Sequence, residues 1–263
     1  MRPAGAGTGV GSVLKGLGGA LVAVGLWELL RATGVLPGSI VPPTFTVLRA
    51  MVNGLTSGEL LHPLAQTATV WAYGLLATVA LAVPLGGLVG LSRWADAAAS
   101  FVFDLVRPVP VVALVPVAVV LLGLGTGMQV PLVVLAAMWP LVYNTRFGVR
   151  NVDPALLDSG RCMGLSRLAL VRRVVLPSAL PSVLTGLRLS ASIAVVITIV
   201  TELVASATGL GQYINLSQQA GHFADALSGV LLAGLFGCAI NVAAVLLESR
   251  VLAWHRGMTR ARD

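Results

Sequence analysis

The sequence predicts an all-α protein that crosses a membrane six times. Of its 263 residues, 57% are hydrophobic and only 10% are charged, and the mean hydropathy is +0.92. A soluble domain carries about 25% charged residues, so this chain cannot cover its surface with side chains that favour water. Because about 20 apolar residues cross a bilayer as one helix, the chain has room for several spans joined by short loops.

Six apolar runs rich in Leu, Ala and Val supply the candidate spans. They lie near residues 12–31, 64–91, 101–123, 127–147, 185–206 and 227–252. Between the first two runs, Ile40–Leu55 carries apolar residues at helical spacing after a Pro-Pro pair, which predicts a short helix at the membrane surface. An even number of spans places both termini on one side of the membrane.

Basic residues orient the spans. The segments Gly123–Gln129 and Ser206–Ala226 contain no Lys or Arg, and only Arg31 and Arg49 fall on their side of the membrane. Since cytoplasmic loops carry an excess of Lys and Arg, we expect both termini and the arginine-rich loop before the fifth span in the cytoplasm. The net charge of +7 then reflects topology rather than a nucleic-acid partner. We expect one transmembrane domain over 1–263, with cytoplasmic segments at 1–11, 148–181 and 255–263.

The cytoplasmic loop is predicted to form a helix, a turn and a second helix. Asp153 fits a helix N-cap, and Pro154 fits the first helical position, where its missing N–H costs nothing. Gly164 fits the left-handed residue that follows a helix, and Ser166 fits the N-cap of the next one. Pro177 is expected to end the second helix, because proline cannot donate to the helical ladder and restricts the residue before it.

The turn at Met163-Gly164-Leu165 brings apolar side chains close to water. Such side chains favour burial, so we infer that another cytoplasmic protein covers them. The alternative is an ordinary amphipathic inner loop, whose arginines follow membrane topology alone.

The spacing of residues in this loop distinguishes the two alternatives. An acid, Asp158, is followed by two small residues, Ser159 and Gly160, then by Gly164, and after nine more residues by Val174-x-Leu176-Pro177. The pattern resembles the EAA loop of binding-protein-dependent ABC importer permeases. It departs from the usual Glu, two alanines and Ile at Asp158, Ser159, Gly160 and Val174, and each departure keeps the charge or a small or aliphatic side chain. Gly160 weakens its helix by about 1 kcal/mol relative to alanine.

The resemblance extends over roughly residues 35–257 and is closest to the nitrate/sulfonate/taurine subgroup. The further landmarks are Arg107–Pro116, Gly123-Leu124-Gly125, Tyr143-Asn144-Thr145, Val152-Asp153-Pro154, Leu176–Pro181, Gly186-Leu187-Arg188, Thr201-Glu202 and Gly209-Leu210-Gly211. Cys162-Met163-Gly164 also suits the glycine-betaine branch, which stays open as an alternative. The substrate is left open among nitrate, taurine or another sulfonate, bicarbonate, and precursors of thiamine or riboflavin.

The resemblance implies the type I ABC importer permease fold, with a cytoplasmic coupling helix between the fourth and fifth spans. It implies partners: ABC ATPase subunits, an external substrate-binding protein, a second permease copy in a homodimer, and the lipid of a bacterial inner membrane. The residues expected to contact the ATPase are Asp158, Ser159, Gly160, Arg161, Met163, Gly164, Leu165 and Pro177.

The chain itself is not expected to hydrolyse ATP. A Walker A loop needs a Gly-Lys-Ser/Thr sequence to hold phosphates and Mg²⁺, and the only lysine here is Lys15, in V-L-K-G-L. ATP and Mg²⁺ are therefore expected in the separate ATPase subunit, with no cofactor in this chain. The histidines, His62, His222 and His255, are far apart in sequence and do not indicate a metal site.

Polar residues inside the spans are the candidates for a translocation pathway or gate, because polar groups in a bilayer usually face the interior of a bundle. They are Thr67, Tyr73, Asn144, Thr198 and Glu202. Each could instead form an ordinary hydrogen bond between helices. The competing classes are an ion channel, a secondary transporter and an integral-membrane enzyme, for which the sequence offers neither broken-helix repeats nor paired catalytic acids.

Overall fold

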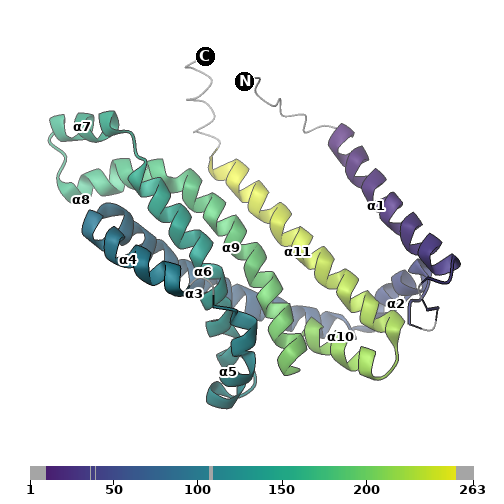
Figure 1. Ribbon diagram of the computed structural model, residues 1–263. Helices are drawn as coiled ribbons and strands as arrows, with labels where there is room; N and C mark the ends of the chain where they lie inside the picture. The colour runs from purple at the N-terminus through teal and green to yellow at the C-terminus, as the bar shows by residue number, and fades with distance from the viewer. Residues whose placement is uncertain (1–9, 36, 39, 107–108, 253–263) are drawn as a thin grey trace.

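The computed structural model describes residues 10–35, 37–38, 40–106 and 109–252, and all regular structure in these ranges is helical (Figure 1). This confirms the predicted all-α class. The predicted end segments at 1–11 and 255–263 lie mostly or wholly outside the described residues.

The helices are α1 (Val10–Ala32), α2 (Thr44–Ser57), α3 (Leu61–Leu91), α4 (Arg93–Val106), a 3-10 turn η1 (Val111–Leu114), α5 (Val115–Leu122), α6 (Thr126–Arg150), α7 (Pro154–Cys162), α8 (Arg167–Leu170), a π turn η2 (Val171–Val175), α9 (Leu176–Ala205), α10 (Leu210–Gln219) and α11 (Phe223–Val251).

Four helical stretches within the described residues are long and apolar enough to cross a membrane. They are Leu61–Leu91, Thr126–Arg150, Arg167–Ala205 and Phe223–Val251. The expected span at 101–123 is not one helix, because the chain there is divided into α4, η1 and α5. Pro110 lies between the pieces with an extended backbone, at φ −73° and ψ 95°, and proline cannot donate the hydrogen bond that would continue a helix.

The core of the molecule consists of α3, α6 and α9, which make the most extensive helix–helix contacts. Glycines allow these helices to approach closely. A Cβ atom added at Gly86 of α3 would lie 2.7 Å from the Val142 carbonyl oxygen of α6, and one at Gly148 of α6 would lie 2.9 Å from the Ala179 carbonyl oxygen of α9. Side chains at these two positions would therefore push backbones apart.

Polar side chains connect α9 to three other helices. Ser190 Oγ donates to the Ala137 carbonyl oxygen of α6 at 2.6 Å, and the Trp71 indole of α3 donates to the Ala191 carbonyl oxygen at 3.1 Å. Arg188 Nε donates to Asn241 Oδ1 of α11 at 2.9 Å. In an apolar surrounding, such bonds satisfy groups that would otherwise be costly to bury. They fix α9 within the bundle.

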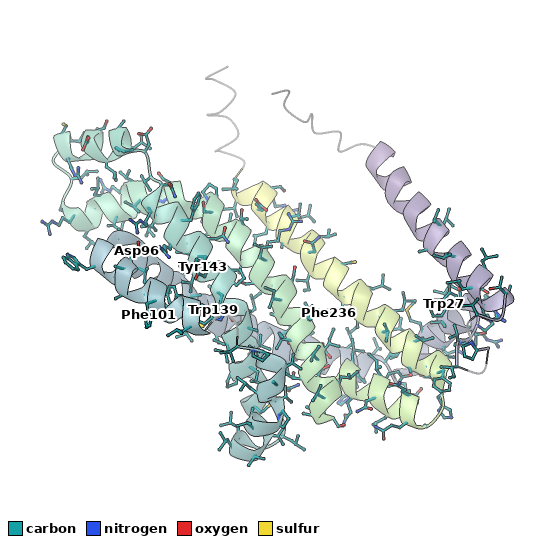
Figure 2. All side chains as sticks on the ribbon, in the orientation of Figure 1. Trp27, Asp96, Phe101, Trp139, Tyr143 and Phe236 are labelled. Carbon is teal, nitrogen blue, oxygen red and sulfur yellow. The ribbon has the colours of Figure 1, made fainter. Side chains whose placement is uncertain are left out.

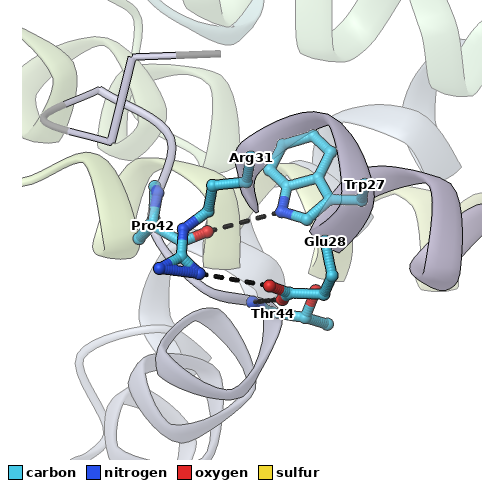
Figure 3. A network of polar contacts seen from close by, with 5 residues as sticks. All are labelled: Trp27, Glu28, Arg31, Pro42 and Thr44. Carbon is cyan, nitrogen blue, oxygen red and sulfur yellow. Dashed lines mark hydrogen bonds and ion pairs between the residues drawn. The ribbon is translucent and has the colours of Figure 1, made fainter. Parts of the chain in front are cut away.

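Helix α1 leans away from the other helices and meets them near α2 (Figure 1). Two side chains of α1 make the connection (Figure 3). The Glu28 carboxylate accepts from the Thr44 backbone N–H at 2.7 Å and pairs with Arg31 at 3.1 Å, while the Trp27 indole donates to the Pro42 carbonyl oxygen at 3.4 Å. Thr44 is the first residue of α2, whose own N-cap position is a proline without a side-chain cap. Glu28 thus satisfies one of the unpaired N–H groups at the start of α2.

The two ends of the helix bundle carry different segments. Figure 1 places α7, α8, the start of α1 and the end of α11 at one end, and α5 and α10 at the other. The arginine-rich loop therefore lies at the end where the described chain begins and stops, and the segments without Lys or Arg lie opposite.

Candidate functional site

The first helix of the arginine-rich loop begins and ends as the sequence predicts. Asp153 Oδ1 accepts from the Ala155 N–H at 2.9 Å, and Pro154 is the first residue of α7. After α7, Gly164 takes the left-handed conformation with φ +76°. Its N–H donates to the Arg161 carbonyl oxygen at 2.9 Å, and the next N–H donates to the Gly160 carbonyl oxygen at 3.1 Å. This pair of bonds is a Schellman motif, which explains the sharp turn.

The second helix begins as predicted but does not end at Pro177. Ser166 Oγ accepts from the Ala169 N–H at 3.3 Å at the start of α8. The chain then forms the π turn η2, in which the Leu176 N–H donates to the Val171 carbonyl oxygen, and continues directly into α9. Pro177 falls in the first turn of α9. The π turn lies directly before Pro177, and the helical stretch runs without a break from Arg167 to Ala205.

The loop presents an apolar tip to its surroundings. Met163 is 81% exposed, and Leu168 is also exposed, while Leu165 is half-buried and Gly160 is buried. A Cβ added at Gly160 would lie 2.6 Å from Leu170 Cδ1, so the small residue lets α7 pack closely against α8.

The other loop residues singled out from the sequence differ in exposure and in contacts. Arg161 and Asp158 form an exposed ion pair at 2.8 Å, which adds little stability in water. Ser159 is exposed and Pro177 is half-buried. The candidate ATPase-contacting residues are therefore grouped on one loop, most of them accessible to a partner.

A small apolar cluster attaches the loop to the long helices. It contains Val149 of α6, Val152, Val175 of η2 and Ala179 of α9, all buried, with Leu157 and Val174 packed against it. The loop is therefore supported from both sides by the helices that it connects.

An ion-pair cluster that sequence reasoning missed joins α4 to the adjacent end of α6. Asp96 pairs with Arg146 and Arg150, and Phe103 packs edge-on against Trp139 and Tyr143 with ring centroids 5.5 and 5.9 Å apart. Figure 2 places Asp96 and Tyr143 toward the end of the molecule that carries α7. A surplus of basic residues was visible in the sequence, but Asp96 lies some 50 residues before its partners and no spacing rule connects them.

Beside these arginines lies an open cavity of about 650 Å³, lined by Tyr143, Asn144, Arg146, Phe147, Arg150 and Asn151. Asn144 is a candidate pathway residue, and its amide also donates to the Pro140 carbonyl oxygen at 2.8 Å within α6. The cavity thus combines guanidinium and amide donors at the end of the bundle where the loop lies. Such donors suit an anion.

At the opposite end, two of the other candidates meet in a buried polar cluster. Thr67 of α3 and Glu202 of α9 are both fully buried. Thr67 Oγ1 donates to Glu202 Oε2 at 2.9 Å, and Glu202 Oε2 also accepts from the Gly211 N–H of α10 at 3.0 Å. In turn, Thr67 Oγ1 accepts from the Leu210 N–H at 2.9 Å. We call these four residues the Glu202 junction.

The remaining pathway candidates do not join this cluster. Thr198 is fully buried one turn before Glu202, and its hydroxyl has no hydrogen-bond partner among the described residues. Tyr73 is 56% exposed on the surface of α3. The structure thus separates the five candidates into the buried Thr67, Thr198 and Glu202, the exposed Tyr73, and Asn144 at the cavity.

Long apolar helices that could cross a membrane and a loop with the EAA spacing define the class of the protein: it is the permease subunit of an ABC importer. The subunit crosses the inner membrane several times and is not itself an enzyme. The chain belongs to the family of binding-protein-dependent transport system inner membrane components, which matches residues 82–252.

Sequence relatives agree with this assignment, and a solved structure shares the fold. The chain is 28% identical over 242 residues to the putative aliphatic sulfonates transport permease protein SsuC of Bacillus subtilis, covering 92% of this chain and 88% of the relative. It is 32% identical over 232 residues to SsuC of Escherichia coli, with 88% of each chain covered. It is 27% identical over 251 residues to the taurine transport system permease protein TauC of E. coli, covering 92% of this chain and 90% of the relative. The fold matches the inward-facing MetNI methionine ABC transporter with a TM-score of 0.64 at 19% identity, over 73% of this chain and 95% of that one.

Proposed function

We propose that this chain forms the membrane pathway of an importer for a small sulfonate such as taurine. The printed functions of the relatives support a sulfonate, since two of them are named for aliphatic sulfonates and one for taurine. The cavity beside Arg146 and Arg150 adds support for an anionic group, because these two guanidinium groups share a single carboxylate, Asp96.

The loop at 148–181 contacts the ATPase in this proposal. Exposed Met163 and the Schellman turn at Gly164 provide a shaped apolar contact, and the buried cluster of Val149, Val152, Val175 and Ala179 supports it. Closure of two ATPase subunits around ATP then moves the loops of two permease copies, and the helices with them, between inward-open and outward-open states. A homodimer is the simplest arrangement that provides the second half of the pathway.

The proposal includes six spans with both termini in the cytoplasm. The four long apolar helices supply four of them. Helix α1, with 23 residues, is about 34 Å long and sufficient for a fifth. Helices α4 and α5 in succession extend from the end of the bundle with α7 to the opposite end (Figure 1), which supports a divided sixth span.

Uptake into proteoliposomes tests the substrate. The permease is reconstituted with the ATPase and the binding protein of its operon, and ATP-dependent uptake of radiolabelled taurine is measured against unlabelled methanesulfonate, nitrate, bicarbonate and glycine betaine. We expect uptake that requires the ATPase and is inhibited by the sulfonate. Inhibition by glycine betaine alone would reject the substrate assignment, and uptake without the ATPase would reject the mechanism.

Thiol labelling tests the orientation. Cys162 is exposed at the end of α7 and Cys238 is the only other cysteine. In a Cys238→Ser background, a membrane-impermeant maleimide should label Cys162 in inverted vesicles and not in intact cells. A Cys162→Ser, Gln218→Cys variant, labelled on α10, should give the reverse result. Labelling of Cys162 from outside would refute the orientation.

A further inference from the structure

The Glu202 junction is packed so closely that the two glycines beside it, Gly209 and Gly211, have no room for a side chain. A Cβ added at Gly209 would overlap the Glu202 carboxylate, and one at Gly211 would overlap both the Ile199 carbonyl oxygen and Glu202 Cβ. Leu210, between the two glycines, is fully buried and packs with Leu60 and Leu232. The chain that connects α9 to α10 is therefore held against α9 by direct backbone contact.

The hydrogen bonds of the junction are made by the first N–H groups of α10. Leu210 and Gly211 open that helix, so their N–H groups have no acceptor within it. Thr67 of α3 and Glu202 of α9 supply the acceptors, and together they attach the start of α10 to two long helices. Burying a carboxylate is expensive. Glu202 Oε2 accepts from two donors and so connects three helices, while Oε1 is buried without a partner among the described residues.

The same helical stretch that carries Glu202 begins at the loop. Arg167–Ala205 is continuous over 39 residues, which corresponds to about 58 Å. At its outer end, α10 exposes Leu216, Gln218 and Gln219, in a segment that contains no Lys or Arg. One continuous helical stretch, with the π turn η2 within it, therefore connects α10 at one end of the bundle to the arginine-rich loop at the other.

We propose that Glu202, together with Thr67, is a positioning residue that makes α10 move with α9, so that contact of the external binding protein with α10 is transmitted along α9 to the ATPase. This role rests on the proposed orientation and on the proposed contact between the loop and the ATPase. In this proposal Glu202 holds α10 against α9 and does not contact the transported solute.

Conservative changes at Thr67 test the junction. Thr67→Val keeps the shape but removes the hydroxyl that donates to Glu202 and accepts from Leu210. Thr67→Ser restores that hydroxyl. Thr69→Val is the matched control, because the Thr69 hydroxyl donates only within α3, to the Ala65 carbonyl oxygen at 2.7 Å, and is exposed. All variants are prepared as complete complexes with the ATPase in nanodiscs.

Two quantities are measured on each complex. Deuterium exchange of peptides covering 207–216 reports the junction itself. The ratio of ATP hydrolysis with and without the external binding protein, purified with its naturally bound solute, reports the transmission. For Thr67→Val we expect amide exchange faster by roughly tenfold and a hydrolysis ratio that falls toward one, with basal hydrolysis unchanged. Thr67→Ser and Thr69→Val should match the wild type in both measurements.

Several results would overturn the inference. If Thr67→Val exchanges like the wild type, the junction does not hold α10. If exchange accelerates while the hydrolysis ratio is unchanged, the junction is only structural. If the wild-type complex is not stimulated, there is no signal to transmit, and co-purification of the ATPase with the permease decides separately whether the proposed docking of the loop stands.

Discussion

Replacing Gly164 with alanine changes the turn between α7 and α8 without changing its packing. The residue has φ +76°, and a Cβ added there would meet no heavy atom within 4 Å. The entire cost is therefore conformational, and a left-handed backbone costs an L-residue about 1–2 kcal/mol relative to glycine. If the ATPase recognises the turn in this shape, the Kd of the permease–ATPase complex rises by about fivefold to thirtyfold.

The assay is titration of the purified ATPase onto nanodisc-embedded permease, followed by fluorescence anisotropy. Gly127→Ala is the matched control, because Gly127 lies in α6 with nothing within 4 Å of an added Cβ and no positive φ. Gly164→Asn should weaken binding less than Gly164→Ala, since asparagine tolerates the left-handed conformation better. Equal affinities for wild type and Gly164→Ala would refute the argument that this turn is the contact surface.

Two further predictions concern the stability of the helix bundle, measured by thermal unfolding in detergent. Asp96→Asn leaves two arginines without their shared counter-charge and should lower the free energy of unfolding by about 2–4 kcal/mol. Asp158→Asn breaks an exposed pair and should change it by less than about 1 kcal/mol. Equal effects of the two variants would contradict the assigned role of Asp96. Gly148→Val should destabilise by about 1–3 kcal/mol or more, because its side chain would meet the Ala179 backbone, while Gly234→Val has no neighbour within 4 Å. A stable Gly148→Val variant would show that α6 and α9 do not depend on this close approach.

Local features of the loop could be predicted from the sequence. The caps at Asp153 and Ser166 and the turn at Gly164 depend on residues within five positions of each other, so short-range rules suffice for them. The prediction for Pro177 failed although it is also local. Whether a proline ends a helix depends on whether a π turn and packed neighbours can accommodate it, as they do before α9.

The sequence by itself determined that this protein is a helical membrane permease, because hydropathy, charge asymmetry and the spacing of the loop are properties of consecutive residues. Only the tertiary structure decided which polar residues form hydrogen bonds with one another. Thr67 and Glu202 are 135 positions apart and hydrogen-bond directly, whereas Tyr73, six residues after Thr67, lies on the surface. The physical reason is that a polar group in an apolar environment takes its partner from whichever helix packs beside it. That neighbour is fixed by the contacts among α3, α6, α9 and α10, which no spacing along the chain encodes.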